Sequence, residues 1–123
     1  MEHNPVGWFE LYVQDMARAR KFYESVFGFN FTKIESPGMD MLGFPMEQNK
    51  AGAGGALVKM DGVPSGGGGT LIYFVCDDCA NEAKKAAASG GQVHKDKFSI
   101  GPYGFIALVA DTEGNMVGLH SMR

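Results

Sequence analysis

The stretch FELYVQDMARARKFYESVFGF, residues 9–29, decides the fold because LIYFVCDDCANEAKKAAASGGQV, residues 71–93, repeats its order of features. Each stretch runs from an apolar, strand-like segment through an aspartate and an amphipathic helical pattern to a glycine. An aspartate caps a helix by accepting hydrogen bonds from free N–H groups of the first turn, and glycine adopts the left-handed conformation that ends a helix. The capping aspartates and the terminating glycines stand thirteen residues apart in both stretches: Asp15 with Gly28, and Asp77 with Gly90. The chain therefore contains a duplicated strand–helix unit.

Three further strand-like runs follow each predicted helix, and turns rich in glycine and proline separate them. This order predicts an α+β fold that consists of two βαβββ modules in a single domain. Module one covers about residues 6–60, and module two covers about residues 70–121. Between them, DGVPSGGGG at residues 61–69 is expected to be a flexible connector, because consecutive glycines hold structure poorly.

The composition is that of one globular domain. Of the 123 residues, 45% are hydrophobic and 20% are charged, and the formal net charge is -3. The absence of a basic stripe argues against nucleic acid as a partner. No apolar run reaches the ~18 residues of a membrane span, and the first residues lack the pattern of a secretory signal. We therefore expect a cytoplasmic protein with no membrane or nucleic-acid partner.

The duplicated pattern resembles a known superfamily. Its two most specific phrases are LYVQDMARARKFYESVFGF at residues 11–29 and ADTEGNMVGLH at residues 110–120. Together they are similar to the vicinal oxygen chelate superfamily, which contains glyoxalase I, bleomycin-resistance proteins and extradiol dioxygenases. The phrases GWFE, GGAL and GLHS also resemble small bacterial proteins described as related to lactoylglutathione lyase. The resemblance implies curved mixed sheets around a cleft, and a homodimer.

The resemblance further implies a divalent metal held by His, Glu or Gln on the first and fourth strand of each module. Counting along the repeat places these four positions at Trp8, Ala56, Leu71 and Gly118. None of these side chains offers a lone pair suited to such an ion. We therefore expect no metal and no cofactor, and a divalent metal only if this count misplaces the ligands.

Alternation along the first strand sorts its side chains into two faces. Phe9 and Leu11 are expected to pack on a helix, whereas Trp8, Glu10 and Tyr12 are expected to line the cleft. Apolar walls with a few polar groups are typical of a small-molecule site.

Glu10 and His120 are the predicted catalytic pair, because a carboxylate beside an imidazole supports general acid–base chemistry. His120 shares a face of the last strand with Gly118, where glycine would leave room for a ligand. The predicted substrate-binding residues are Trp8, Tyr12, Tyr73, Tyr103 and Gly118. Three structural alternatives stay open: a solvated charge on an edge strand for Glu10, a surface or dimer contact for His120, and a place in the core for Trp8.

The two cysteines, Cys76 and Cys79, form a C-x-x-C motif. This motif occurs in redox pairs and in zinc sites, but a closed zinc site needs four ligands and the chain lacks a second such pair. Small buried thiols are common in ordinary cores, and we favour that interpretation.

These observations predict a metal-independent small-molecule binder or enzyme, with the substrate and the question of catalysis left open. One alternative is a metal-dependent lyase, isomerase or dioxygenase with non-standard ligands. Another is a resistance protein that sequesters an antibiotic or toxin. Glyoxalase I activity is not expected, because the metal ligands are missing from their positions.

Overall fold

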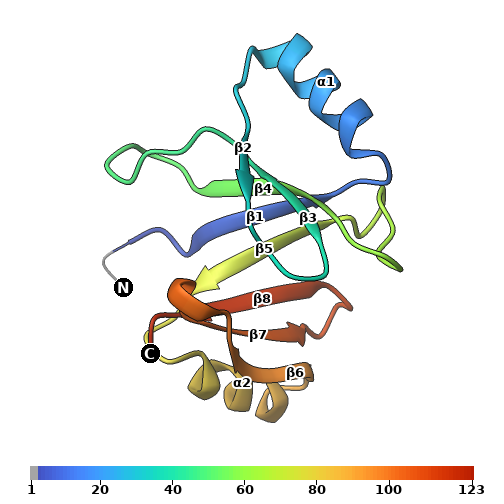
Figure 1. Ribbon diagram of the computed structural model, residues 1–123. Helices are drawn as coiled ribbons and strands as arrows, with labels where there is room; N and C mark the ends of the chain where they lie inside the picture. The colour runs from blue at the N-terminus through green and yellow to red at the C-terminus, as the bar shows by residue number, and fades with distance from the viewer. Residues whose placement is uncertain (1–2) are drawn as a thin grey trace. The chain divides into compact units, whose positions relative to one another are not determined.

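The computed structural model describes residues 3–123, which divide into two compact units (Figure 1). The N-terminal unit is Trp8–Thr70, and the C-terminal unit is Leu71–Arg123 together with the residues up to Gly7. Each unit has one helix and four strands in the order βαβββ, so the predicted α+β class with two such modules is confirmed. None of the helices within residues 3–123 is long and apolar enough to cross a membrane.

The sheet of the N-terminal unit has the strand order β2-β3-β4-β1. Strand β1 runs parallel to β4, and the other neighbours are antiparallel. Helix α1 (Met16–Phe27) follows the first strand. The strands are β1 (Val6–Tyr12), β2 (Thr32–Ile34), β3 (Asp40–Gly43) and β4 (Gly54–Lys59).

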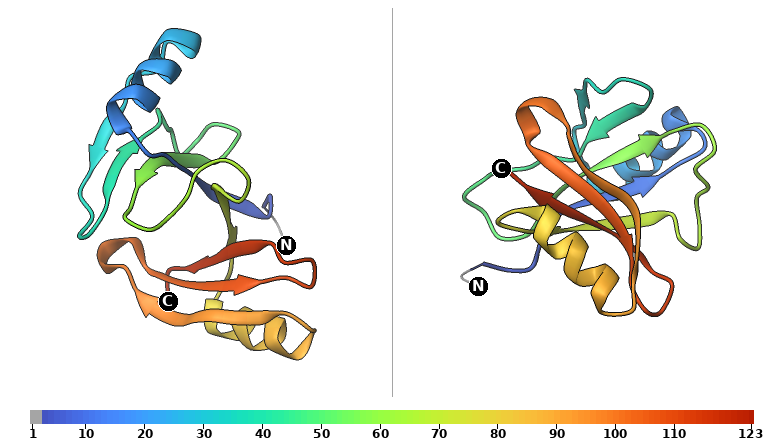
Figure 2. Two further views of the ribbon diagram at one scale, coloured as in Figure 1. Left: turned by 90° about the vertical axis from the view of Figure 1, so that its right-hand side faces the viewer. Right: turned by 90° about the horizontal axis from the view of Figure 1, so that it is seen from below.

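The C-terminal unit repeats this arrangement with the strand order β5-β8-β7-β6, and β5 runs parallel to β8. Helix α2 (Cys79–Ala88) lies along β6, β7 and β8 (Figure 2). A short 3-10 turn, Gly101–Tyr103, precedes β7. The strands are β5 (Thr70–Val75), β6 (Gln92–Ser99), β7 (Phe105–Ala110) and β8 (Met116–Ser121).

The caps of α1 follow the sequence pattern, whereas α2 is capped one residue away from the prediction at both ends, with Ser89 and not Gly90 at its end. Asp15 caps α1 by accepting a hydrogen bond from the Arg18 N–H, and Gly28 ends the helix with a φ of 74°. The cap of α2 is Asp78 and not Asp77, so that prediction was wrong by one residue. Two adjacent aspartates are equivalent in the sequence pattern, but it is Asp78 that has the extended backbone of a cap and accepts a hydrogen bond from the Ala80 N–H.

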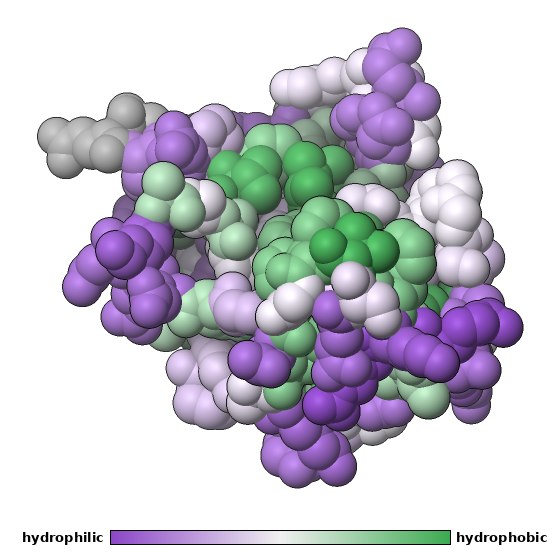
Figure 3. All heavy atoms as spheres, turned by 90° about the horizontal axis from the view of Figure 1, so that it is seen from above, coloured by the Kyte–Doolittle hydropathy of each residue, from purple (hydrophilic) through white to green (hydrophobic). Residues whose placement is uncertain are grey.

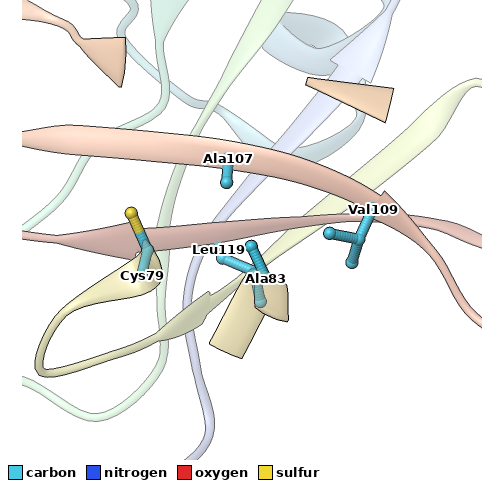
Figure 4. Close-up of a cluster of buried hydrophobic side chains, with 5 residues drawn as sticks. All are labelled: Cys79, Ala83, Ala107, Val109 and Leu119. Atoms are coloured by element: carbon cyan, nitrogen blue, oxygen red, sulfur yellow. The ribbon is translucent and has the colours of Figure 1, made fainter. Parts of the chain in front are cut away.

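Small side chains let α2 sit close to its sheet (Figure 4). A cluster of five buried residues lies between this helix and strands β7 and β8: Cys79, Ala83, Ala107, Val109 and Leu119. The buried cluster of the N-terminal unit is Met41, Ala56 and Val58, and it lies in β3 and β4 against Trp8 and Tyr12. Among the described residues, α2 contributes to a buried cluster and α1 contributes to none.

Helix α1 contributes no buried residue, although its sequence predicts an apolar face. Phe22, Val26 and Phe27 are between 55% and 59% exposed. Figures 1 and 2 show α1 standing out from the strands of its unit, and hydrophobic side chains gather on the face of the molecule seen from above in Figure 3. The apolar periodicity identified the helix correctly, but its large apolar side chains stay more than half exposed.

The connector is anchored to the first strand of the N-terminal unit. The Tyr12 N–H donates to the Gly69 carbonyl oxygen at 2.8 Å, and the Gln14 amide donates to the Val63 carbonyl oxygen at 2.9 Å. Gly62, Gly66 and Gly68 have a positive φ, so the glycines serve a series of turns.

The cap of α2 leads to a prediction about stability. Hydrogen bonds from the Lys97 ammonium and from the Ala80 N–H hold the pKa of Asp78 below its usual range. Replacing Asp78 by alanine should therefore lower the free energy of unfolding more than replacing Asp77 by alanine. Because the folded state depresses this pKa, the contribution is complete above the usual aspartate pKa of about 3.9 and is lost as the pH falls through the lower folded value.

Urea denaturation at neutral and at acidic pH measures both effects. The variant Asp78→Asn is the matched control, because asparagine keeps a capping oxygen but loses the charge. A larger loss for Asp77→Ala than for Asp78→Ala would contradict the assignment of the cap.

Candidate functional site

A buried carboxylate on β1 is the centre of the candidate site. Glu10 is 8% exposed, and both of its oxygens accept hydrogen bonds from side chains of the same strand. The Trp8 indole N–H donates to Oε2 at 3.1 Å, and the Tyr12 hydroxyl donates to Oε1 at 2.8 Å. We call these three side chains the carboxylate clasp.

The geometry of a strand explains how the clasp forms. Residues i, i+2 and i+4 point to the same face, so Trp8 and Tyr12 flank Glu10 on both sides. A separation of two residues is roughly 7 Å along a strand, and long aromatic side chains reach across it. Below them lie Met41, Ala56 and Val58, against which Trp8 and Tyr12 pack. Glu10 is paired in register with Ala56, whose methyl group leaves space for the carboxylate.

Burial raises the pKa of the Tyr12 hydroxyl well above its ordinary value, and the negative charge of Glu10 and the hydrogen bond to it act in the same direction. Tyr12 is therefore protonated at neutral pH and at moderately alkaline pH. It is a permanent hydrogen-bond donor to Glu10.

Two predicted binding residues, Tyr73 and Gly118, lie side by side in the C-terminal unit. They are paired in register between β5 and β8. The Tyr73 ring covers Gly118 so closely that a Cβ atom at position 118 would lie 2.2 Å from Cδ1 of the ring. Glycine in this strand therefore makes room for Tyr73. The expectation that Gly118 leaves room for a ligand is corrected accordingly.

His120 is held by the loop that contains Tyr103. Its Nε2 atom lies 2.5 Å from the Tyr103 carbonyl oxygen. Because a carbonyl oxygen only accepts, Nε2 carries a proton, and Nδ1 is the nitrogen available for other chemistry. The Tyr103 side chain is 60% exposed. The pairing of Glu10 with His120 stays a prediction, because Glu10 belongs to the N-terminal unit and His120 to the C-terminal unit.

The side chains at the four expected metal positions do not fit a divalent metal. Trp8 uses its indole N–H in the clasp, and Ala56 and Leu71 are buried apolar residues. At the fourth position, a carboxylate in place of Gly118 would collide with the ring of Tyr73. Within residues 3–123, no group of three or more His, Cys, Asp or Glu side chains is arranged to hold a metal ion.

The two cysteines have different environments. Cys79 is fully buried in the core, and its N–H donates to the Ser121 hydroxyl at 3.0 Å. Burial, and then the negative charge of Glu82, raise the pKa of the Cys76 thiol to about 11. A thiol with a raised pKa is a poor nucleophile, so these environments favour packing over redox chemistry.

The clasp was only partly visible in the sequence. Alternation placed Trp8, Glu10 and Tyr12 on one face, but the interpretation of Glu10 as a solvated edge charge is wrong because Glu10 is buried. An aromatic hydrogen-bond donor two residues before and two residues after a strand carboxylate was the signal that indicated burial. The aromatic cover over Gly118 had no comparable signal, because Tyr73 and Gly118 are far apart in the sequence.

Comparison with known proteins identifies the family and the fold. A family model described as "Glyoxalase/Bleomycin resistance protein/Dioxygenase superfamily" matches residues 6–119. Among curated proteins, "Putative glyoxylase CFP32" of Mycobacterium bovis and of Mycobacterium tuberculosis is 32% identical over 115 residues, which are 92% of this chain and 44% of that protein. The chain thus spans less than half the length of these relatives. A "Glyoxylase-like domain-containing protein" of Didymella fabae is 27% identical over 92% of this chain and 90% of its own.

Solved structures share the fold at low sequence identity. A hypothetical protein from Bacillus halodurans has a TM-score of 0.72 at 10% identity, with 96% of this chain and 94% of that chain covered. A methylmalonyl-CoA epimerase from Mycobacterium tuberculosis has a TM-score of 0.69 at 12% identity, with 97% and 88% covered.

The contact between Tyr73 and Gly118 leads to a testable coupling. Replacing Gly118 by alanine should lower the free energy of unfolding by about 1–3 kcal/mol, because the added methyl group overpacks the site. In the double variant Tyr73→Leu, Gly118→Ala, the total loss should be smaller than the sum of the two single losses. Urea denaturation of wild-type protein, the two single variants and the double variant measures the coupling. If the losses of unfolding free energy simply add, the two side chains do not compete for the same space.

Proposed function

Because the chain belongs to the glyoxalase/bleomycin resistance protein/dioxygenase superfamily, we propose that it is a metal-independent small-molecule-binding protein in which Glu10 anchors the ligand. The observation that carries this proposal is the carboxylate clasp. A buried carboxylate needs hydrogen bonds to compensate for the loss of water. A chain that needed only a stable strand would place an apolar residue at position 10.

The clasp fixes the orientation of the carboxylate. Each oxygen accepts a hydrogen bond from an aromatic side chain, so the carboxylate plane cannot rotate freely, and such preorganisation favours selective binding. The aromatic rings of Trp8 and Tyr12 add flat apolar surface on both sides of the charge. This chemistry suits a small organic molecule that presents a hydroxyl, amine or amide N–H group beside an unsaturated or apolar body.

A second candidate function is proton transfer. A carboxylate in a fixed orientation also fits the role of a general base, and the mycobacterial relatives carry the name glyoxylase. The four metal positions do not support a metal-dependent version of that chemistry. The proposal therefore assigns the proton-accepting atom to Glu10 itself.

A ligand screen tests the proposal. Wild-type protein and Glu10→Gln are screened against one library of small polar organic molecules, using ligand-observed NMR and the shift in melting temperature. Glutamine keeps the size of the side chain but removes its charge, and a hydrogen bond to a charged group is worth about 1.5–3 kcal/mol. The ligands that bind wild-type protein should therefore bind Glu10→Gln about 10-fold to 100-fold more weakly.

Glu35→Gln is the matched control, because the side chain of Glu35 is 88% exposed in the same unit. It should bind the ligands as tightly as wild-type protein does. The variant Tyr12→Phe should show an intermediate loss, because it removes one of the two donors of the clasp. Ligands that bind wild-type protein and Glu10→Gln equally well would contradict the proposal. Formation of S-lactoylglutathione from methylglyoxal and glutathione by wild-type protein, lost in Glu10→Gln, would select the second candidate.

A further inference from the structure

A hollow lies in the N-terminal unit, on the face of β1 opposite the carboxylate clasp. Its volume is about 340 Å³, and apolar side chains line it. Phe9 and Leu11 come from β1, Tyr23 and Phe27 come from α1, and Phe44 follows β3. Because side chains alternate along a strand, Phe9 and Leu11 face away from the carboxylate clasp. We call this hollow the aromatic pocket.

The wall of the aromatic pocket is organised around one ring. The centroid of Phe44 lies 5.4 Å from that of Phe9, 5.6 Å from that of Tyr23 and 5.6 Å from that of Phe29. Tyr23 and Phe29 meet Phe44 edge-to-face, at 80° and 85°. This is a favourable geometry for aromatic pairs, so the rings hold one another in place.

The position of Phe9 depends on a glycine. A Cβ atom at Gly55 would lie 2.5 Å from the Phe9 ring, so only glycine lets this ring lie flat against β4. With the ring in that position, the space above it stays open.

The helix does not close the pocket. Helix α2 has alanines along its length and buries Cys79 and Ala83 against its sheet, whereas α1 presents aromatic rings to its strands and buries none. Tyr23 and Phe27 contribute their rings to the wall of the pocket. Phe27 is 59% exposed at the rim.

The size and polarity of the pocket define its ligand. A cavity of about 150 Å³ lined by apolar residues is sufficient to bind benzene, and the aromatic pocket has about twice that volume. Among the side chains that line the pocket, that of Tyr23 carries a hydroxyl group and the others are apolar. We propose that the aromatic pocket binds a planar molecule of one or two fused aromatic rings with one hydroxyl group, which hydrogen-bonds to Tyr23.

This site is independent of the proposed function, because it uses the other face of β1. An occupant would stack on rings that are already oriented, so little ordering is needed to bind it. It would also cover the exposed surface of Phe27, which is otherwise in contact with water.

Calorimetric titration with 2-naphthol tests the proposal on the full chain. Wild-type protein should bind one molecule per chain, saturably, and the aromatic NMR signals of Phe9, Phe29 and Phe44 should shift. The variant Ala53→Leu places a larger side chain in the wall of the pocket and should weaken binding at least tenfold. Ala51→Leu makes the same change at an exposed position two residues away and should leave binding unchanged.

Two further variants test whether binding of 2-naphthol depends on the Tyr23 hydroxyl and whether it depends on the carboxylate clasp. Tyr23→Phe keeps the ring and removes the hydroxyl, so it should weaken 2-naphthol but not naphthalene. Glu10→Gln should leave 2-naphthol binding unchanged, which distinguishes this site from the carboxylate clasp. Circular dichroism checks that each variant is folded.

Three outcomes would overturn the proposal. The first is the absence of saturable binding to wild-type protein. The second is equal binding by wild-type protein and folded Ala53→Leu. The third is self-association, detected by sedimentation, that buries Phe27 and prevents 2-naphthol from binding.

Discussion

Glu10 keeps a carboxylate away from water on a strand that otherwise carries apolar and aromatic side chains, and the two hydrogen bonds from Trp8 and Tyr12 make this possible. The dependence is mutual, because the charge of Glu10 contributes to the raised pKa that keeps the Tyr12 hydroxyl protonated. Removing either donor leaves a buried oxygen without that partner, and removing the carboxylate leaves two half-buried donors without their acceptor. The clasp also fixes which face of β1 is polar, and therefore which face is left to Phe9 and Leu11.

A second constraint recurs in both units. An aromatic ring lies over a glycine of the parallel neighbouring strand, as Phe9 over Gly55 and as Tyr73 over Gly118. The two rings lie on different faces of their sheets. Phe9 lies on the side of α1. Phe74, the neighbour of Tyr73 in β5, packs with the core around α2, so Tyr73 lies on the face opposite α2. The first ring shapes the aromatic pocket, and the second occupies the space that a ligand side chain at position 118 would need. An aromatic ring that lies over a glycine thus has a different consequence in each of the two units.

Much of the fold follows from local signals in the sequence. The alternation of apolar residues, the cap at Asp15 and the stop at Gly28 identify their elements because each depends on neighbouring residues. The errors arise where distant residues decide. Asp78 and not Asp77 caps α2, because only the folded chain shows which carboxylate reaches the Ala80 N–H. The face of Glu10 was predictable, but its burial depends on Ala56 and Val58, and the role of Gly118 depends on Tyr73.

We propose that the side chains at positions 8, 56, 71 and 118 hold no metal ion, because Trp8 is engaged in the carboxylate clasp, Ala56 and Leu71 are buried apolar residues, and Gly118 is covered by Tyr73. Metal analysis tests it most directly: untagged protein is offered zinc, nickel, manganese and iron in turn, its metal content is measured by mass spectrometry, and its melting temperature is recorded with and without each ion. A bound ion would raise the melting temperature, because it stabilises the folded state by mass action. We predict no stoichiometric metal and no change in melting temperature with any of the four ions. One tightly bound ion per chain, with a matching rise in melting temperature, would contradict the claim.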